Sequence, residues 1–137
     1  LISAVAILAM LDRNPDKKMS DLKRALPVTY GSPTMSPFCP DTEKYGVVEK
    51  VTAEYLRLKD TRAKILGQEI AAVTTVNGVR VTLADGTWGL VRASSNKPNL
   101  VVVVESPVSA KNMKAMFDEI DARLSRFPEV GAYDQKI

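Results

Sequence analysis

The segment Arg92-Ala93-Ser94-Ser95-Asn96-Lys97-Pro98 gathers side chains that suit the binding of an anion. A guanidinium, two hydroxyls, a carboxamide and an ammonium lie close together in it, and none of its side chains is acidic. The planar guanidinium of Arg92 matches two phosphate oxygens, while Ser94, Ser95 and Asn96 can donate to the remaining ones. Backbone N–H groups of a turn can converge on the same anion. These residues therefore predict an anion site, most simply one for phosphate.

The same segment is also compatible with a plain surface turn. Ser, Asn, Lys and Pro are common in exposed connections, where their side chains suit tight or solvated backbone. Composition alone therefore leaves both interpretations open, an anion site and a polar turn without a ligand.

Other kinds of chemistry are excluded by what the chain lacks. It contains no histidine, so neither a Ser-His-Asp relay nor a histidine-ligated metal site can form. The single cysteine, Cys39, rules out an intrachain disulfide, and no histidine is present to activate its thiol. We therefore expect a cytoplasmic protein in which Cys39 is a small buried residue.

Charge and composition favour a globular domain with neither a nucleic-acid nor a membrane partner. The 137 residues include 19 basic and 16 acidic side chains, a net charge of +3, with no run of Lys and Arg that would mark a nucleic-acid interface. This length suits one domain with its own core. The apolar residues 1–11 are fewer than the ~20 that span a bilayer, and no basic region of a signal peptide precedes them.

Hydrophobic periodicity predicts the elements that would position the anion segment. Helices are expected over residues 1–12, 21–26, 42–58 and 109–125. Strands are expected over residues 71–76, 79–84, 87–93 and 100–105. Together they predict an α+β domain, in which a four-stranded antiparallel sheet carries helices on one face and is preceded by a short helical segment.

Several boundaries follow from turn and cap residues. We expect Ser20, Asp41 and Ser109 to cap the second, third and fourth helices. Gly67 is expected to end the third helix, unless residues 59–61 interrupt it. Asn77-Gly78 predicts a two-residue hairpin turn. The continuous apolar run at residues 100–104 predicts a central strand.

The start of the chain suggests that the sequence is a fragment of a larger protein. Residues 1–11 would form a helix that is apolar all round, and such a helix needs neighbours on every side. Four prolines then punctuate residues 27–40, which predicts an extended connector or an edge strand. We therefore expect residues 1–26 to be the helical tail of a preceding domain, 27–40 a linker or edge strand, and 41–137 the domain that holds the anion segment.

The stretch from Gly86 to Glu105 resembles the last-domain signature of the α-D-phosphohexomutases, the phosphomannomutase/phosphoglucomutase superfamily. In that family a strand ends in Arg-Ala-Ser-Asn-Thr-x-Pro and an apolar strand ending in Glu follows. Here the matching positions are Arg92, Ala93, Ser94 and Pro98. Ser95 stands where the family usually has Asn, and Asn96 where it has Thr, and both keep a side chain that forms hydrogen bonds. The likeness extends to Asn77-Gly78-Val79-Arg80-Val81, to Cys39-Pro40-Asp41 and to the first helices, which resemble the end of the family's third domain.

This resemblance implies a function for residues 41–137 as a C-terminal phosphate-binding domain with a TATA-box-binding-protein-like fold. Arg92, Ser94, Ser95 and Asn96 would bind the non-reacting phosphate of a hexose phosphate while a phosphoryl group moves between the 1- and 6-positions of mannose or glucose. The family's phosphoserine, Mg²⁺ and sugar loops lie in three further domains, and their motifs are absent from this sequence. The resemblance thus implies no catalytic residue and no cofactor in this chain, and Mg²⁺ and a hexose 1,6-bisphosphate activator for the intact enzyme.

Two other interpretations compete with this one. A phosphoglucosamine or phosphoacetylglucosamine mutase would usually carry Arg-Pro-Ser-Gly-Thr-Glu-Pro in the loop, and Ala93, Ser95 and Lys97 disagree with it. A stand-alone nucleic-acid or adaptor module of similar α+β fold would need exposed aromatic residues interleaved with basic ones. Trp88 and Tyr133 are isolated, so the sequence favours the phosphohexomutase domain.

Overall fold

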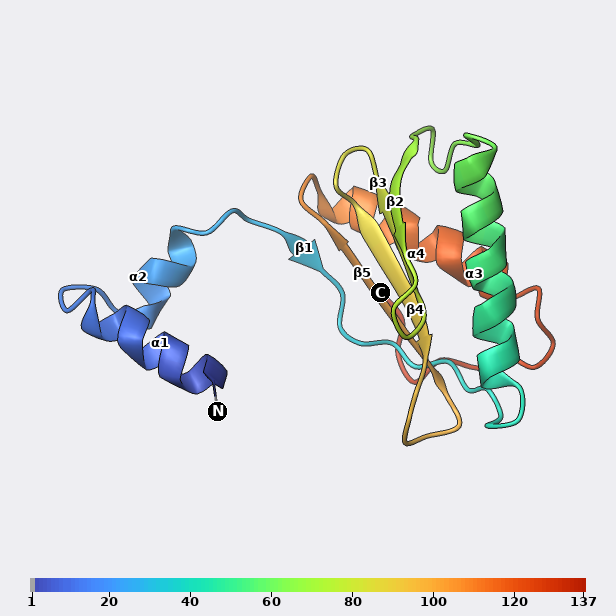
Figure 1. The fold of residues 1–137 in the computed structure, drawn as a ribbon, viewed down its shortest axis with the longest axis horizontal. Helices are drawn as coiled ribbons and strands as arrows, with labels where there is room; N and C mark the ends of the chain where they lie inside the picture. Colours follow the sequence, from blue (N-terminus) through green and yellow to red (C-terminus); the bar gives the residue numbers. More distant parts are fainter. Residues whose placement is uncertain (1) are drawn as a thin grey trace.

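Residues 2–137, which the computed structural model describes, form four helices and one antiparallel sheet of five strands (Figure 1). The helices are α1 (Ile2–Asp12), α2 (Met19–Arg24), α3 (Lys44–Asp60) and α4 (Ala110–Leu124). The strands are β1 (Tyr30–Gly31), β2 (Ile70–Thr74), β3 (Val79–Leu83), β4 (Trp88–Ala93) and β5 (Leu100–Ser106). Their order across the sheet is β1-β5-β4-β3-β2. The predicted α+β class and the four predicted strands are confirmed.

The fifth strand comes from the proline-rich segment before α3. Tyr30 and Gly31 of β1 pair with Ser106 and Glu105 of β5. Strand β5 therefore lies between β1 and β4, and its predicted central position is confirmed. Strand β1 has only two residues, too few to show the alternation from which a strand is predicted.

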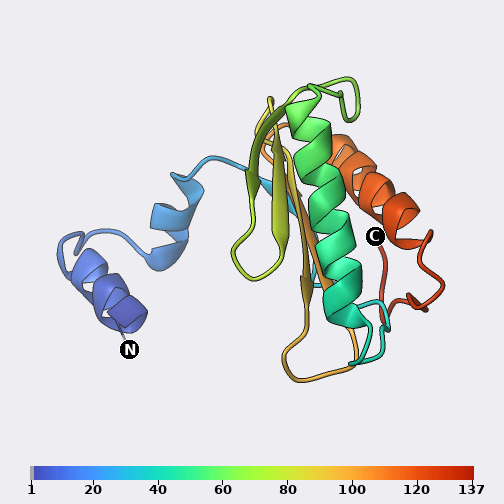
Figure 2. The same ribbon diagram turned by 45° about the vertical axis from the view of Figure 1, so that its right-hand side comes forward.

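Helices α3 and α4 cover the same face of the sheet, as predicted (Figure 2). Along β3, Val79, Val81 and Leu83 are buried beneath the helices, whereas Arg80 between them is exposed. Helix α4 contributes an apolar stripe to the core, namely Met116, Phe117, Ile120 and Leu124. Gly89 of β4 lies directly under this stripe, and a Cβ there would collide with the side chains of Ile120 and Met116. The close packing of α4 on the sheet therefore leaves no room for a side chain at this position unless the ends of Ile120 and Met116 shift.

The start of α3 differs from the prediction, whereas its end falls at the predicted interruption over residues 59–61 rather than at Gly67. The helix begins at Lys44 with Glu43 at the N-cap, so Asp41 lies in the turn before it rather than capping it. It ends at Asp60, well before Gly67, because Arg62 adopts a left-handed φ of 54°. The N–H groups of Ala63 and Arg62 then donate to the carbonyls of Leu58 and Lys59, a Schellman closure that needs no glycine.

Two smaller boundaries also differ from the prediction. Helix α2 begins at Met19, so Ser20 lies within it, and the carboxylate of Asp21 accepts from the N–H of Lys18 instead. At the first hairpin, Thr74 pairs with Arg80, which leaves more residues in the turn than the two predicted. Ser109, by contrast, caps α4 as predicted, since its Oγ accepts from the N–H of Asn112.

The predicted extent of helix α1 is confirmed, but the helix contributes no residue to the hydrophobic core. None of its described residues is buried, and Ile2, Val5 and Leu8 are 87%, 60% and 65% exposed. In Figure 1, α1 and α2 lie apart from the sheet and its two covering helices. The division of the chain at residues 26 and 40 stays a prediction. None of the described helices is both long and apolar enough to cross a membrane.

Candidate functional site

The predicted anion segment forms the connection between β4 and β5, called here the β4–β5 loop (residues 94–99). The N-terminus of α3 lies at the same end of the sheet (Figure 1). Arg92 belongs to β4, where it pairs with Val101 and sits between the inward-facing Val91 and Ala93. Its side chain therefore starts from the face of the sheet that the helices leave uncovered.

Arg92 keeps most of its donors unused. Its Nη1 donates to the carbonyl of Ala93 at 3.1 Å, which holds the guanidinium beside the end of β4. No other acceptor for this side chain lies among residues 2–137. A guanidinium has five N–H groups in a fixed planar fork, so a pair of them remains free to meet two oxygens of an anion.

The tip of the loop offers further donors without partners. The side chains of Ser94, Ser95 and Asn96 make no hydrogen bond to any residue in the described part of the chain. The backbone N–H groups of Ser95, Asn96 and Lys97 likewise have no acceptor there. Ser94 is half-buried, and the next residues are exposed. The structure thus places Ser94, Ser95 and Asn96 on one loop and Arg92 near the end of the strand that leads into it. That these four residues bind phosphate stays a prediction.

The base of the loop, by contrast, is held by backbone hydrogen bonds. The N–H of Ser94 donates to the carbonyl of Asn99 at 2.9 Å, and the N–H of Asn99 donates to the carbonyl of Lys97 at 2.8 Å. From outside the loop, the N–H of Cys39 donates to the carbonyl of Pro98 at 2.8 Å. The ends of the loop are therefore fixed by hydrogen bonds, unlike those of a surface segment without such contacts.

Lys44 is a further residue of the site that the sequence analysis missed. Its side chain is buried, with 3% of the residue exposed. Its Nζ donates to Ser94 O at 2.6 Å, to Lys97 O at 3.1 Å and to Asp41 Oδ1 at 2.6 Å. A lysine in the first turn of a helix opposes the helix dipole, which is the signal that could have marked it as unusual. Its contact with a loop fifty residues away was not visible from sequence.

Cys39 is buried, as expected. The residue is fully inaccessible and belongs to the core cluster. Burial raises the pKa of its thiol, and the nearby carboxylates of Glu129 and Glu43 raise it further. A thiol with a raised pKa is a poor nucleophile at neutral pH, so Cys39 contributes its backbone N–H to the site rather than its sulfur.

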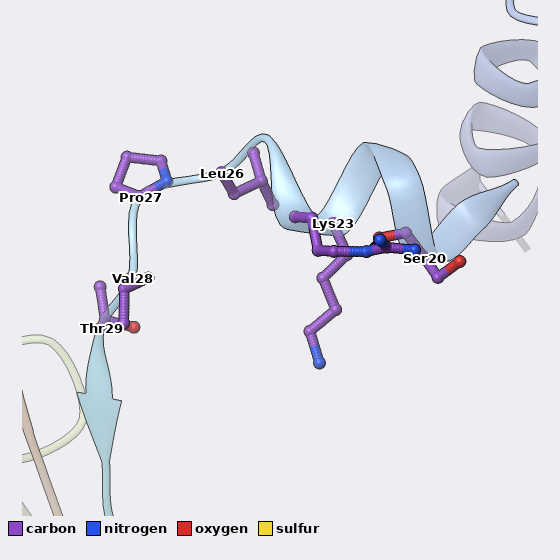
Figure 3. A pocket seen from close by; sticks show the side chains of 7 residues that line it. Ser20, Lys23, Leu26, Pro27, Val28 and Thr29 are labelled. Carbon is purple, nitrogen blue, oxygen red and sulfur yellow. Dashed lines mark hydrogen bonds between the residues drawn. The ribbon is translucent and has the colours of Figure 1, made fainter. Parts of the chain in front are cut away.

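A hollow of about 610 Å³ lies elsewhere, between α2 and the extended segment that leads to β1 (Figure 3). Its lining consists of Ser20, Lys23, Arg24, Leu26, Pro27, Val28 and Thr29, all of them exposed. Arg24 already pairs with Asp21 at 2.7 Å. The hollow is an open surface depression without a buried polar group, and it shares no residue with the β4–β5 loop.

Comparison with known proteins connects this architecture to one family. The family described as "Phosphoglucomutase/phosphomannomutase, C-terminal domain" matches residues 39–123, more than half of the chain. A solved phosphoglucomutase/phosphomannomutase family protein from Burkholderia thailandensis superposes with a TM-score of 0.56 at 22% identity, over 78% of this chain and 19% of that one. The structural likeness shows a shared fold.

Curated relatives carry the same relationship in sequence. A phosphopentomutase of Thermococcus kodakarensis is 32% identical over 120 residues, covering 88% of this chain and 24% of the relative. A phosphomannomutase/phosphoglucomutase of Pseudomonas syringae pv. tomato is 32% identical over 111 residues, covering 81% and 21%. A probable phosphoglucosamine mutase of Methanothermobacter thermautotrophicus is 36% identical over 73 residues, covering 53% and 14%. The chain thus spans a quarter or less of these relatives, and it belongs to the phosphoglucomutase/phosphomannomutase C-terminal domain family.

Proposed function

We propose that this chain is the phosphate-binding domain of a sugar-phosphate mutase, in which Arg92, Ser94, Ser95 and Asn96 hold the phosphate that is not being transferred. The observation that carries the proposal is the set of free donors at the tip of the β4–β5 loop, on a base that is fully hydrogen-bonded. A surface turn needs neither feature, whereas an anion site needs both, because donors must converge without the anion having to order them.

The proposed mechanism is one of positioning. Phosphoryl transfer asks little covalent chemistry of the protein and much alignment. Binding energy from a remote phosphate can close the active-site cleft and align the reacting oxygen. A bisphosphorylated intermediate must turn around during a mutase reaction, so the site has to accept the phosphate of either end. Donors that contact phosphate oxygens alone satisfy this need.

The sugar is proposed to be a hexose, with mannose or glucose 1-phosphate converted to the 6-phosphate. This rests on Ala93, which matches the phosphohexomutase loop, and on Ser95, which stands where the phosphoglucosamine mutases usually have Gly. The relatives are named for pentose, hexosamine and hexose phosphates, and phosphate is what these substrates share. Contacts to the sugar ring would come from three further domains of the enzyme.

The Mg²⁺ that the resemblance implies does not fit the residues of this chain. Across residues 2–137, no three His, Cys, Asp or Glu side chains are grouped so that they could hold a metal ion. The β4–β5 loop itself contains no carboxylate. No step of the proposal passes through a metal or through a bisphosphate activator, and both would belong to the rest of the enzyme.

A nucleic-acid or adaptor module is disfavoured by the uncovered face of the sheet. Strands β2 to β5 carry a single aromatic residue, Trp88. The guanidinium of Arg80 lies 4.2 Å from the centre of its ring, so that face of the ring is already covered. Single-strand binders use several free aromatic faces in succession, which this sheet does not offer.

Turnover by a mutase that contains this chain as its last domain tests the proposal. Arg92→Ala should lower kcat/KM for mannose 1-phosphate about 100-fold, because each charge-assisted hydrogen bond contributes ~1.5–3 kcal/mol. Arg92→Lys should recover only part, since an ammonium cannot reproduce the fork. Phosphorylation of the active-site serine should persist in both variants, as expected for a residue that grips the substrate.

Arg80→Ala is the matched control, because it removes a guanidinium from the neighbouring strand and should change kcat/KM less than about threefold. The loss for Arg92→Ala should also be equal, within a similar factor, for mannose, glucose, glucosamine and pentose 1-phosphates where each is turned over. Unchanged turnover of Arg92→Ala would reduce the loop to a polar surface turn. A loss confined to one sugar would show that Arg92 reads the sugar rather than the phosphate.

A further inference from the structure

Lys44 occupies a position that is unfavourable for a lysine on two counts. Its ammonium is buried, and removing a charge from water costs free energy unless hydrogen bonds compensate it. It is also the first residue of α3, where the partial positive charge of the helix N-terminus opposes a cation. A residue that breaks two local rules at the edge of a candidate site calls for a functional explanation.

The compensation comes from three oxygens, two of which belong to the β4–β5 loop. An ammonium has three N–H groups, and Nζ of Lys44 uses them on Ser94 O, Lys97 O and Asp41 Oδ1. Ser94 and Lys97 are the two ends of the loop's tip. One buried charge therefore clamps both ends of the segment that carries the free donors.

This clamp determines which way the loop's backbone faces. In a trans peptide unit, the C=O and the following N–H point in opposite directions. Because Ser94 O points at the buried ammonium, the N–H of Ser95 points away from it, toward solvent. At the other end, Lys97 O is also turned inward, and the following residue, Pro98, has no N–H group that would need an acceptor. Two carbonyl oxygens that would repel an anion, those of Ser94 and Lys97, are thus turned away from the tip, and the amide of Ser95, which would attract one, is presented there.

We propose that Lys44 is a positioning residue for phosphate, which orients the Ser94–Ser95 peptide so that the loop presents donors rather than acceptors. The inference rests on the proposed phosphate-binding function of the loop. Lys44 acts through the backbone and does not touch the anion, since all three of its N–H groups already have acceptors within the protein. It couples the start of α3 to the shape of a loop fifty residues further along the chain.

Titration of the ¹⁵N-labelled 137-residue chain with inorganic phosphate, at constant ionic strength, tests the inference. The unsubstituted chain should show saturable shifts at the amides of Ser95 and Asn96, and Arg92→Ala should abolish them. Lys44→Met, which keeps the length of the side chain, should raise the phosphate dissociation constant about tenfold, because the Ser95 amide would no longer be held toward the anion and its hydrogen bond to a charged oxygen would be lost. Lys44→Gln retains two N–H donors and should restore part of the affinity.

Two control variants distinguish a positioning role of Lys44 from a general effect of its charge and from an effect on the stability of the fold. Lys97→Met removes an exposed ammonium from the loop itself, and its smaller effect should vanish at 0.5 M salt, whereas that of Lys44→Met should persist. Val51→Ala should destabilise the same helix through a buried position without weakening phosphate binding.

The outcomes distinguish the two proposals. Phosphate binding that is lost in Arg92→Ala but unchanged in both Lys44→Met and Lys44→Gln overturns the role of Lys44 and leaves the phosphate site standing. If Lys44→Met does not fold, the Lys44→Gln variant decides alone. A phosphate affinity and a Ser95 amide chemical shift that both equal those of the unsubstituted chain would then overturn the role of Lys44. Absence of any loop shift in the unsubstituted chain overturns both proposals together.

Discussion

Two connections at the same end of the sheet are built in opposite ways. The turn between β2 and β3 is shaped by its own residues, with Asn77 at a φ of 54° and Gly78 at 126°. The β4–β5 loop contains no residue of positive φ, and it is held instead by Lys44 and Cys39 from a distant part of the chain. The first connection only reverses the chain, while the second also presents free donors.

The difference matches the functions proposed for the two connections. A turn that only reverses the chain can use its backbone groups internally, so residues with the right φ are sufficient. A loop that binds an anion must keep the N–H groups of its tip for the ligand, and here only the N–H groups of Ser94 and Asn99, at the base, are used within the loop. Its shape has to come from contacts behind it, made by a rigid scaffold.

The largest effect is expected where the locally shaped turn meets the strand that carries Arg92. A Cβ on Gly78 would lie 2.5 Å from the carbonyl of Val91 and 2.6 Å from the Cβ of Arg92. Gly78→Ala should therefore lower the free energy of unfolding by about 2–4 kcal/mol, from the strained φ and the collision together. Urea unfolding measures this loss, and a value below about 0.5 kcal/mol would mean that the turn yields freely and is independent of β4.

A smaller, pH-dependent effect is expected at the turn between β3 and β4, which side chains stabilise from outside. Partial burial alone would raise the pKa of the Asp85 carboxyl, but hydrogen bonds from Gln68, Thr87 and Asn112 outweigh it and lower the pKa. Ionised Asp85 therefore stabilises the fold above the unfolded pKa of about 4, and this contribution is lost as the pH falls through the lower folded value.

Asp85→Asn should accordingly cost about 1–2 kcal/mol of unfolding free energy at pH 7, because its amide cannot accept all of these bonds. The difference from the unsubstituted chain should shrink below about pH 4. Urea unfolding from pH 3 to pH 7 measures both values. A difference of the same size at pH 3 and pH 7 would show that the Asp85 charge does not hold the turn.

The smallest effect is expected at Asn77, which is exposed and forms no hydrogen bond with the β4–β5 loop. Asn77→Ala should cost about 0.5–1 kcal/mol, because alanine tolerates a left-handed φ less well than asparagine. Phosphate affinity should not change. A weakened affinity would show that the β2–β3 turn and the β4–β5 loop are coupled and do not take their shapes independently.

The same distinction explains what could be predicted from the sequence. The four long strands, helix α4 with its Ser109 cap and the core face of α4 depend on neighbouring residues, and all were predicted. The start of α3 was not, because Asp41 pairs with Lys44 instead of capping the helix. Its end lies at the predicted interruption over residues 59–61, where the positive φ of Arg62 closes the helix without a glycine.

The residues of the candidate site also differ in how far they could be predicted from the sequence. Arg92, Ser94, Ser95 and Asn96 are adjacent in the chain, so their common location at the end of a strand was predictable from residue types alone. Lys44 was not, because its role depends on packing that brings α3 against the loop. Strand β1 was foreseen only as an edge strand or a connector, since two residues show no periodicity.

The most direct test of the central claim, that the β4–β5 loop is a phosphate site, is a crystal structure of this chain grown with phosphate. We expect one phosphate between the guanidinium of Arg92 and the amides of Ser95 and Asn96, with the Ser94 carbonyl still accepting from Nζ of Lys44. Phosphate bound instead beside Lys23 in the hollow next to α2, with the loop empty at saturating concentration, would contradict it.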